Sequence, residues 1–411
     1  MPTHETSARE LHDGLFAFID QAIMPIQREI EHLLHDPRRY WAEDGRVAPE
    51  ILDARQRTRQ ASAAAGFYTM FCPTEFGGGG LGSRMYFDVW EELCYRYGSP
   101  QTQLPFVVLA HTSTGPSALW LHASDELKDE VIGPLSRGEL AGSFAMSEPD
   151  AGSDAWMMTT KATRDGDEWV INGSKMWATY GPTADFVITF AVTDAERFAE
   201  RKGGLTCFYV PADAPGYKVD SIVKCWDEPG GEECIITFDD VRIPDRYRVG
   251  PVGEGFRVAM QGSGQLKLTK TGRTIGLARW SVDRALEFAR VRKTFGKTLD
   301  EHQSIQNMLA DSCTEIYASK AMAWDIADKL DRGLDPHFER SMANTFVFEA
   351  MYRVYDRSMQ ILGGMSLANE SNMIQGWHTL RVCRISEGPT EVQRRAVARH
   401  VLRSGPAFTG M

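Results

Sequence analysis

The spacing of apolar residues changes twice along this chain of 411 residues, and this change limits the fold more than any other feature. Apolar residues recur at helical spacing up to about residue 138 and again beyond residue 251, whereas short β-rich runs lie between. A chain of this length is also too long for one ordinary core. We therefore expect an α+β fold with three domains. They are an N-terminal α-helical domain (1–138), a middle β domain (139–250) and a C-terminal bundle of four helices (251–411).

Apolar periodicity predicts four helices in the first segment, over residues 8–34, 51–65, 85–97 and 114–132. Pro25 should kink or interrupt the first helix, because proline lacks a backbone donor and crowds the preceding turn. A glycine-rich run at 73–82 contains a G-x-G-x-x-G pattern. Since a helix precedes this run and no βαβ unit surrounds it, we expect a turn between helices and not a dinucleotide site.

The middle segment has the signals of β-hairpins. Asp165-Gly166 and Asn172-Gly173 are dipeptides that favour two-residue hairpin turns. The β-rich runs cover residues 169–171, 185–192, 205–210 and 234–238. Together they predict a small antiparallel sheet or barrel.

Helical periodicity returns from about residue 267, with three apolar faces and a final basic helix over 380–402. Gly363-Gly364 ends one of these helices. Long helices with few breaks are typical of a bundle.

Composition restricts the partners. A net charge of −11 offers no basic surplus to neutralise phosphates, which argues against nucleic acid. The seven cysteines include no Cys-x-x-Cys pair, and no apolar run reaches the length of a membrane span. We expect a cytoplasmic protein without disulfides. The ten histidines form no ligand motif, so no metal site is expected.

Two stretches have the composition of a flat ligand's binding loop. Residues 144–154 read Phe-Ala-Met-Ser-Glu-Pro-Asp-Ala-Gly-Ser-Asp, and Met176-Trp177-Ala178-Thr179 follows downstream. Pro149 and Gly152 disfavour regular structure, and small residues allow a planar ligand to approach the backbone. Free N–H groups in such a loop suit an electron-rich ring edge. The alternative is a turn-rich loop with a core tryptophan.

Both stretches resemble the flavin-binding motifs of the acyl-CoA dehydrogenase family, and the α, β, α order matches that family's layout over nearly the whole chain. Arg292-Lys293-Thr294-Phe295-Gly296 with His302-Gln303, and Gln360-Ile361-Leu362-Gly363-Gly364, resemble the motifs that hold FAD across a subunit boundary. The resemblance implies FAD as cofactor and a homo-oligomer, dimer or tetramer, with shared sites. The implied FAD contacts are Phe144, Met146, Ser147, Gly152, Ser153, Trp177, Ala178, Thr179, Arg292, Thr294, Phe295, His302, Gln303, Gln360, Gly363, Gly364, Thr390 and Glu391.

Glu387 is the candidate catalytic base. It lies in Ser386-Glu387-Gly388-Pro389-Thr390, which resembles the family's Tyr-Glu-Gly-Thr loop, whose glutamate removes the α-proton of the thioester. Residues 264–267, where some members place the base, contain no carboxylate. The alternative for Glu387 is a surface glutamate before a helix.

Three residues depart from the family pattern. Ser386 replaces Tyr, Pro389 replaces the hydroxyl-bearing Thr, and Lys267 replaces Arg. The resemblance implies that substrate contacts come from Ser153, Lys267 and Gly388.

The implied reaction is FAD-dependent α,β-dehydrogenation of an acyl-CoA to the trans-2-enoyl-CoA, as in fatty acid β-oxidation, with an electron-transfer flavoprotein as acceptor. An oxygen-using acyl-CoA oxidase and a non-catalytic flavin or CoA-thioester binder are the alternatives. Glu387 argues against the binder, because binding alone needs no base. The sequence leaves the length and branching of the acyl chain open.

Overall fold

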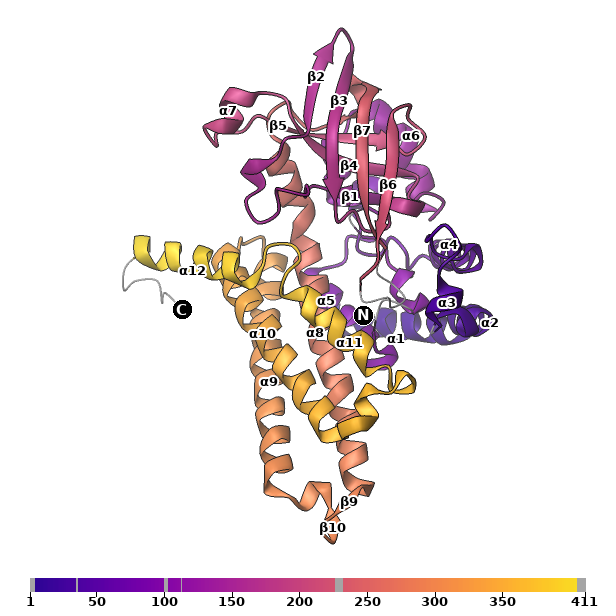
Figure 1. The fold of residues 1–411 in the computed structure, drawn as a ribbon, viewed down its shortest axis with the longest axis vertical. Helices are drawn as coiled ribbons and strands as arrows, with labels where there is room; N and C mark the ends of the chain where they lie inside the picture. Colours follow the sequence, from indigo (N-terminus) through magenta and orange to yellow (C-terminus); the bar gives the residue numbers. More distant parts are fainter. Residues whose placement is uncertain (1–3, 35, 100–102, 112, 226–231, 405–411) are drawn as a thin grey trace. The chain divides into compact units, whose positions relative to one another are not determined.

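The computed structural model describes residues 4–34, 36–99, 103–111, 113–225 and 232–404. The chain divides into two compact units. The first unit contains Met1–Leu81 and Leu104–Leu266, and the second contains Gly82–Gln103 and Lys267–Met411. Figure 1 shows the elements of each unit in chain order. Within the described ranges, no helix has the length and apolarity that crossing a bilayer requires.

The first unit begins with a helix that is interrupted before Pro25, as predicted. Helix α1 (His4–Phe18) continues through one π-helical segment (Ile19–Ile23) into α2 (Met24–Leu34). The wider π turn accommodates the missing donor of Pro25 without ending the helix. The short α3 (Pro37–Tyr40) and α4 (Pro49–Ala64) follow.

The single helix predicted over residues 114–132 is wrong. A 3₁₀ helix, η5 (Ala118–His122), and the separate α6 (Asp125–Ser136) occupy this region. The Ser124 hydroxyl accepts a hydrogen bond from the Leu127 backbone N–H at 3.1 Å, which caps α6. An N-cap serine begins a new helix and therefore divides the apolar pattern.

Eight strands form one sheet in the first unit. They are β1 (Gly142–Ala145), β2 (Lys161–Asp165), β3 (Glu168–Met176), β4 (Phe186–Val192), β5 (Leu205–Pro211), β6 (Tyr217–Val223), β7 (Glu233–Pro244) and β8 (Arg248–Val249). The order is β6-β7-β3-β2-β4-β5-β8, and β1 also pairs with β4. Most pairs are antiparallel as expected, but β1 runs parallel to β4. The apolar sides of the sheet bury a core that includes Trp120, Phe186 and Phe208.

Only one of the two expected hairpin turns exists. Asp165-Gly166 joins β2 to β3, with Asp165 opposite Glu168. Asn172-Gly173 instead lies inside β3, where the register with β7 shifts between Ile171 and Gly173. Gly173 has φ 143°, and a Cβ there would come within 2.6 Å of the Thr160 Cα. The glycine therefore permits a bulge and a close backbone approach, which is the other common use of glycine in strands.

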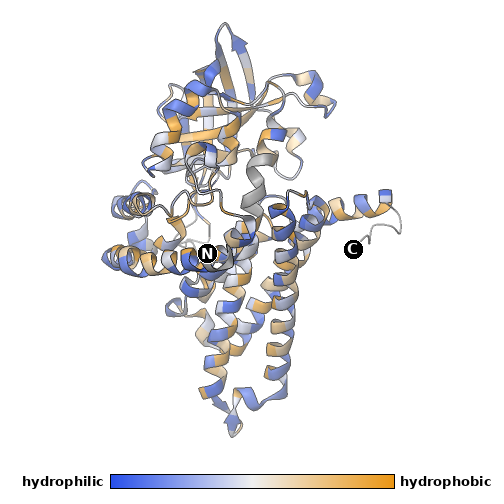
Figure 2. Cartoon of the chain, turned by 180° about the vertical axis from the view of Figure 1, so that it is seen from behind, coloured by the Kyte–Doolittle hydropathy of each residue, from blue (hydrophilic) through white to orange (hydrophobic). Residues whose placement is uncertain are grey.

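The second unit is a helical bundle. Helix α8 (Gly255–Val291) begins earlier than the predicted residue 267, in the first unit, and continues into the second. The other helices of the second unit are α5 (Ser83–Tyr97), α9 (Gln303–Asp331), α10 (His337–Leu362), α11 (Met373–Cys383) and α12 (Thr390–Ser404). The final helix predicted over 380–402 is thus two helices with a loop between them. Figure 2 shows hydrophobic and hydrophilic residues alternating along the bundle helices, as expected for amphipathic helices.

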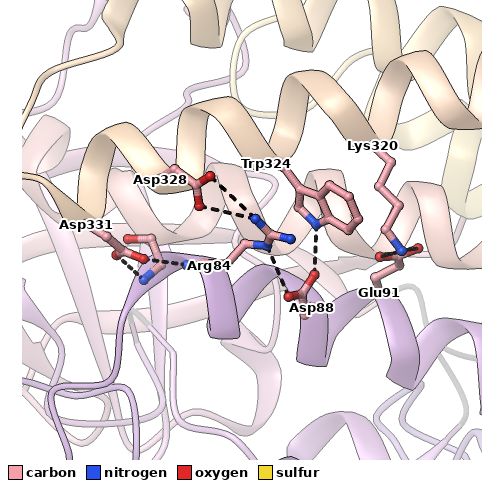
Figure 3. A network of polar contacts seen from close by, with 8 residues as sticks. Arg84, Asp88, Glu91, Lys320, Trp324, Asp328 and Asp331 are labelled. Atoms are coloured by element: carbon pink, nitrogen blue, oxygen red, sulfur yellow. Dashed lines mark hydrogen bonds and ion pairs between the residues drawn. The ribbon is translucent and has the colours of Figure 1, made fainter. Parts of the chain in front are cut away.

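Helix α5 packs against α8 and α9 although it is distant from both in sequence. A Cβ at Gly276 would come within 2.1 Å of the Glu91 carbonyl oxygen, so the backbones of α5 and α8 nearly touch. Toward α9, Arg84 pairs with Asp328 at 3.2 Å and Trp324 donates to Asp88 at 2.9 Å (Figure 3). Asp331 at the end of α9 accepts the first N–H groups of α5 and so caps that helix.

Candidate functional site

The structure brings the two halves of the predicted flavin loop together. Phe144 lies in β1, and the chain leaves the sheet at Met146 and Ser147. The Met176 backbone N–H at the end of β3 donates to the Ser147 carbonyl at 2.9 Å. The Ser143 hydroxyl donates to the Thr179 carbonyl at 2.7 Å. Residues that are about thirty positions apart in sequence thus form one continuous backbone surface.

A buried ion pair stabilises this loop. Lys175 Nζ lies 2.9 Å from Glu148 Oε1, and both side chains are almost fully buried. Lys175 also donates to the Met146 carbonyl at 3.2 Å. The Glu148 carboxylate accepts hydrogen bonds from the backbone N–H groups of Thr159 and Thr160. A buried pair whose remaining hydrogen bonds are satisfied fixes the geometry around it.

The pKa of Glu148 reflects these contacts. Burial by itself would raise the pKa, but the charge of Lys175 and the hydrogen bonds from Lys175, Thr160 and Thr159 outweigh it and lower the pKa to about 2. The carboxylate is therefore ionised at neutral pH. Sequence reasoning missed both Glu148 and Lys175 as supporting residues, although Glu148 lies inside the motif itself.

Trp177 has an unusual backbone conformation. Its φ is 65°, in the left-handed region that bulky residues rarely adopt, and its side chain is 50% exposed. Ala178 is fully buried, whereas Thr179 is exposed. Among the residues that the structure describes, no acceptor is found for the backbone N–H groups of Ser147, Trp177 and Thr179. Strained backbone with unused donors is typical of a ligand-binding surface.

Gly152 and Ser153 lie on the exposed part of the same loop. A Cβ at Gly152 would meet no atom within 4 Å, and its φ is not in the left-handed region. The fold itself therefore does not require a glycine at this position. The space beside it is open, as the predicted close approach of a planar ligand requires.

The candidate base lies in the loop between α11 and α12 of the second unit. Glu387 is exposed and has φ 56°, and Gly388 after it has φ 93°. The Thr390 backbone N–H donates to the Arg384 carbonyl at 3.2 Å, and Gln393 Nε2 donates to the Gly388 carbonyl at 3.3 Å. A glutamate held in the left-handed region points to a functional constraint, because this conformation is costly for a long side chain.

Thr390 is fully buried, and its hydroxyl donates to Glu349 at 2.9 Å. Glu349 also pairs with Arg384 at 2.9 Å. Burial would raise the pKa of Glu349, but the Thr390 hydrogen bond and the Arg384 charge outweigh it and lower the pKa. Thr390 thus holds the loop in this structure, and its contact to FAD remains a prediction. Glu391, the next residue, is exposed in the first turn of α12.

The residues predicted to reach a neighbouring subunit lie on exposed parts of the second unit. Thr294 and Phe295 belong to a hairpin of β9 (Lys293–Thr294) and β10 (Lys297–Thr298). Phe295 is 98% exposed with φ 49°, whereas His302 Nε2 lies 3.3 Å from the Thr294 hydroxyl. Arg292 and Gln303 are exposed beside this hairpin.

Gln360, Gly363 and Gly364 lie at the end of α10 and are exposed. Gly363 has φ 60° and ψ −140°, a conformation that glycine adopts far more readily than other residues. The backbone of Lys267 lies within α8.

Comparison with known proteins identifies the family. Three family models match, the acyl-CoA dehydrogenase N-terminal domain over residues 6–139, the middle domain over 143–241 and the C-terminal domain over 253–402. The mitochondrial short-chain specific acyl-CoA dehydrogenase of Rattus norvegicus is 32% identical over 82% of this chain and 81% of its own length.

The chain belongs to the acyl-CoA dehydrogenase family. A 3-(aryl)acrylate reductase of Clostridium sporogenes is 29% identical over 94% of this chain and 96% of its own length. The solved acyl-CoA dehydrogenase from Geobacillus kaustophilus shares the fold, with a TM-score of 0.81, 22% identity and coverage of 97% and 98% of the two chains. The family identification confirms the predicted fold class and the prediction of a flavin-dependent oxidoreductase.

FAD is the cofactor of this family, as predicted. The first unit fits such a group on its own geometry, because Trp177 is half exposed and, among the described residues, the N–H groups of Ser147, Trp177 and Thr179 have no acceptor. Ser147, Trp177 and Thr179 are the residues that would hold the ring. The individual FAD contacts remain predictions.

Proposed function

We propose that this acyl-CoA dehydrogenase uses Glu387 to remove the α-proton of an acyl-CoA thioester. When bound, FAD supplies the hydride acceptor, at its N5 atom, for the hydrogen that leaves the β-carbon. The α C–H electron pair becomes the new double bond, and the product is a trans-2-enoyl-CoA. Glu387 keeps the α-proton until it exchanges with solvent.

The observation that carries this proposal is the left-handed backbone of Glu387, followed by left-handed Gly388. A general base must hold its carboxylate in a fixed place before the substrate arrives. Glu387 is exposed in the loop between α11 and α12, where its carboxylate is accessible to a substrate. An unconstrained surface glutamate before a helix would not need this conformation.

The remaining parts of the proposal follow from the family. Ser153, Lys267 and Gly388 contact the substrate, an electron-transfer flavoprotein reoxidises the reduced protein, and subunits of a cytoplasmic homo-oligomer share the FAD sites. The exposed Phe295 and the exposed glycines at the end of α10 are accessible to a partner subunit, as a shared site requires.

Anaerobic mixing with acyl-CoAs of graded length, branching and aromatic character tests the reaction. At least one thioester should bleach the flavin absorbance within the mixing experiment. Glu387→Gln should retain FAD and bind the same thioester but lose bleaching by about 10²-fold or more. Glu370→Gln, at another exposed glutamate, is the control and should bleach normally.

Absence of bleaching with every thioester would contradict the dehydrogenase proposal and favour a binding protein. Full activity of Glu387→Gln would remove this residue from the role of base. Peroxide formed in air at the rate of substrate loss would identify an oxidase in place of a dehydrogenase.

A further inference from the structure

The left-handed conformation of Glu387 needs support from the surrounding residues. Two residues in succession, Glu387 and Gly388, have φ values of 56° and 93°. A glutamate keeps such a conformation only where neighbouring contacts determine it. The contacts that hold the peptide immediately before Glu387 are therefore decisive, because φ of Glu387 is measured against the plane of that peptide.

A side chain from a helix that is distant in sequence forms a hydrogen bond with that peptide. Lys270 Nζ, on α8, donates to the Ser386 carbonyl oxygen at 2.5 Å. This oxygen belongs to the peptide bond that joins Ser386 to Glu387. The backbone N–H of Ser386 bonds to the Val382 carbonyl, at the end of α11, so the residue before the base is held from both sides. A hydrogen bond from a charged donor is stronger than one from a neutral donor.

Lys270 is an unusual residue for this position. Its side chain is only 7% exposed, and its ammonium lies 4.7 Å from the centre of the Phe348 ring. Within the described part of the chain, no carboxylate forms an ion pair with it. Buried lysines are rarely retained without such a partner, because the charge loses its hydration. The Ser386 carbonyl and the Phe348 ring are what compensate Lys270 here.

The same neighbourhood includes the charge of the base. Burial raises the pKa of the Cys383 thiol, while the nearby charge of Lys270 lowers this pKa and that of Glu387 raises it. Both charges therefore lie near the same residue at the end of α11.

We propose that Lys270 is a positioning residue for the base, one that holds the Ser386–Glu387 peptide and so maintains the left-handed geometry of Glu387. The inference rests on the proposed function of Glu387. Lys270 itself contacts the loop and takes no part in the transfer of the proton.

Lys270→Met tests this inference, because methionine keeps most of the side-chain volume but removes the donor and the charge. The rate of flavin bleaching at saturating acyl-CoA should fall at least about tenfold, with FAD content and the thioester dissociation constant unchanged. Lys270→Gln, which keeps a neutral donor, should recover part of the rate. Arg284→Met is the matched control on the same helix, since Arg284 is an exposed cation that lies over the Trp280 ring, and its rate should remain normal.

A second measurement does not depend on turnover. Glu387→Gly relieves the need for support at residue 387, because glycine adopts positive φ freely. The drop in melting temperature caused by Lys270→Met should therefore be clearly smaller in a Glu387→Gly background than in the wild type. Equal drops in both backgrounds would overturn the inference, as would a Lys270→Met variant that bleaches at the wild-type rate. If no thioester bleaches the wild type, the proposed function fails, and the melting-temperature comparison still decides the role of Lys270.

Discussion

At the scale of the residue, the candidate site contains residues with strained backbone conformations that neighbouring contacts must maintain. Trp177, Phe295 and Glu387 were all predicted as site residues, and all three have positive φ. Their backbone strain could not be predicted, because the sequence shows which residues are present but not which peptide planes are held. At these residues, a substitution that relieves backbone strain should stabilise the protein but reduce its activity.

Glu387→Gly should therefore leave the protein as stable as the wild type or more stable by up to about 1 kcal/mol, while abolishing turnover. The left-handed region costs a non-glycine residue about 1–2 kcal/mol, and relief of this cost equals or exceeds the roughly 0.5–1 kcal/mol lost to the extra flexibility of glycine in the unfolded chain. Denaturant unfolding measures the change. Glu287→Gly, at an exposed position within α8, is the control and should lose about 1 kcal/mol. An equal loss in both variants would contradict the strain at Glu387.

The depressed pKa of Glu148 gives a second prediction, on pH. Because its pKa is about 2 in the folded protein and its ordinary value is 4.5, the unfolded chain binds the proton more readily. The stabilisation is therefore complete above about pH 4.5 and is lost as the pH falls toward 2. The difference in unfolding free energy between the wild type and Glu148→Gln should shrink over this window. A difference in unfolding free energy that stays constant from pH 6 to pH 3 would contradict the lowered pKa of Glu148.

At the scale of the element, the four predicted β-rich runs correspond to β3, β4, β5 and β7, but the sequence did not predict how the elements contact one another. The hairpin at Asp165-Gly166 is real, whereas Asn172-Gly173 serves a bulge, because the same dipeptide suits both uses. The strand β1 was missed, since Gly142–Ala145 is short and pairs with β4 only through tertiary structure. Buried lysines such as Lys175 could not be predicted either, because burial depends on segments that are remote in sequence.

Gly276→Ala should destabilise the second unit by about 1–3 kcal/mol, more if α5 cannot shift. The added Cβ would come within 2.1 Å of the Glu91 carbonyl on α5, and backbone cannot move aside as a flexible side chain can. Gly133→Ala, within α6, is the control. There the nearest atom is the end of the Arg137 side chain at 3.2 Å, so alanine should be neutral or stabilising by up to about 1 kcal/mol. Thermal unfolding of both variants provides the comparison.

At the scale of the whole molecule, the predicted three-domain division remains a prediction. The contact pattern separates two units instead, with α5 joined to the C-terminal helices although it lies within residues 1–138. In the second unit, the β9–β10 hairpin leaves the side chain of Phe295 almost wholly exposed. We expect a second copy of the chain to cover it.

Phe295→Asp should therefore weaken the proposed homo-oligomer and reduce its FAD content together. A charge at the hairpin tip would be costly to bury in a contact between copies of the chain. Light scattering gives the mass, and the ratio of flavin to protein absorbance gives the occupancy. Leu334→Asp, at an exposed residue after α9, should change neither. An unchanged mass for Phe295→Asp would place this hairpin outside the contact.

The cap that Asp331 provides for α5 bears on how the chain is made in the cell. The capping carboxylate is 248 positions later in sequence than Ser83, whose N–H it accepts. At roughly 5–20 residues per second, a ribosome delivers it about 10–50 seconds after α5 has emerged. During that interval the apolar face of α5 lacks its contacts with α8 and α9. A chaperone that shelters such a face would act on the nascent chain before it acted on any completed one.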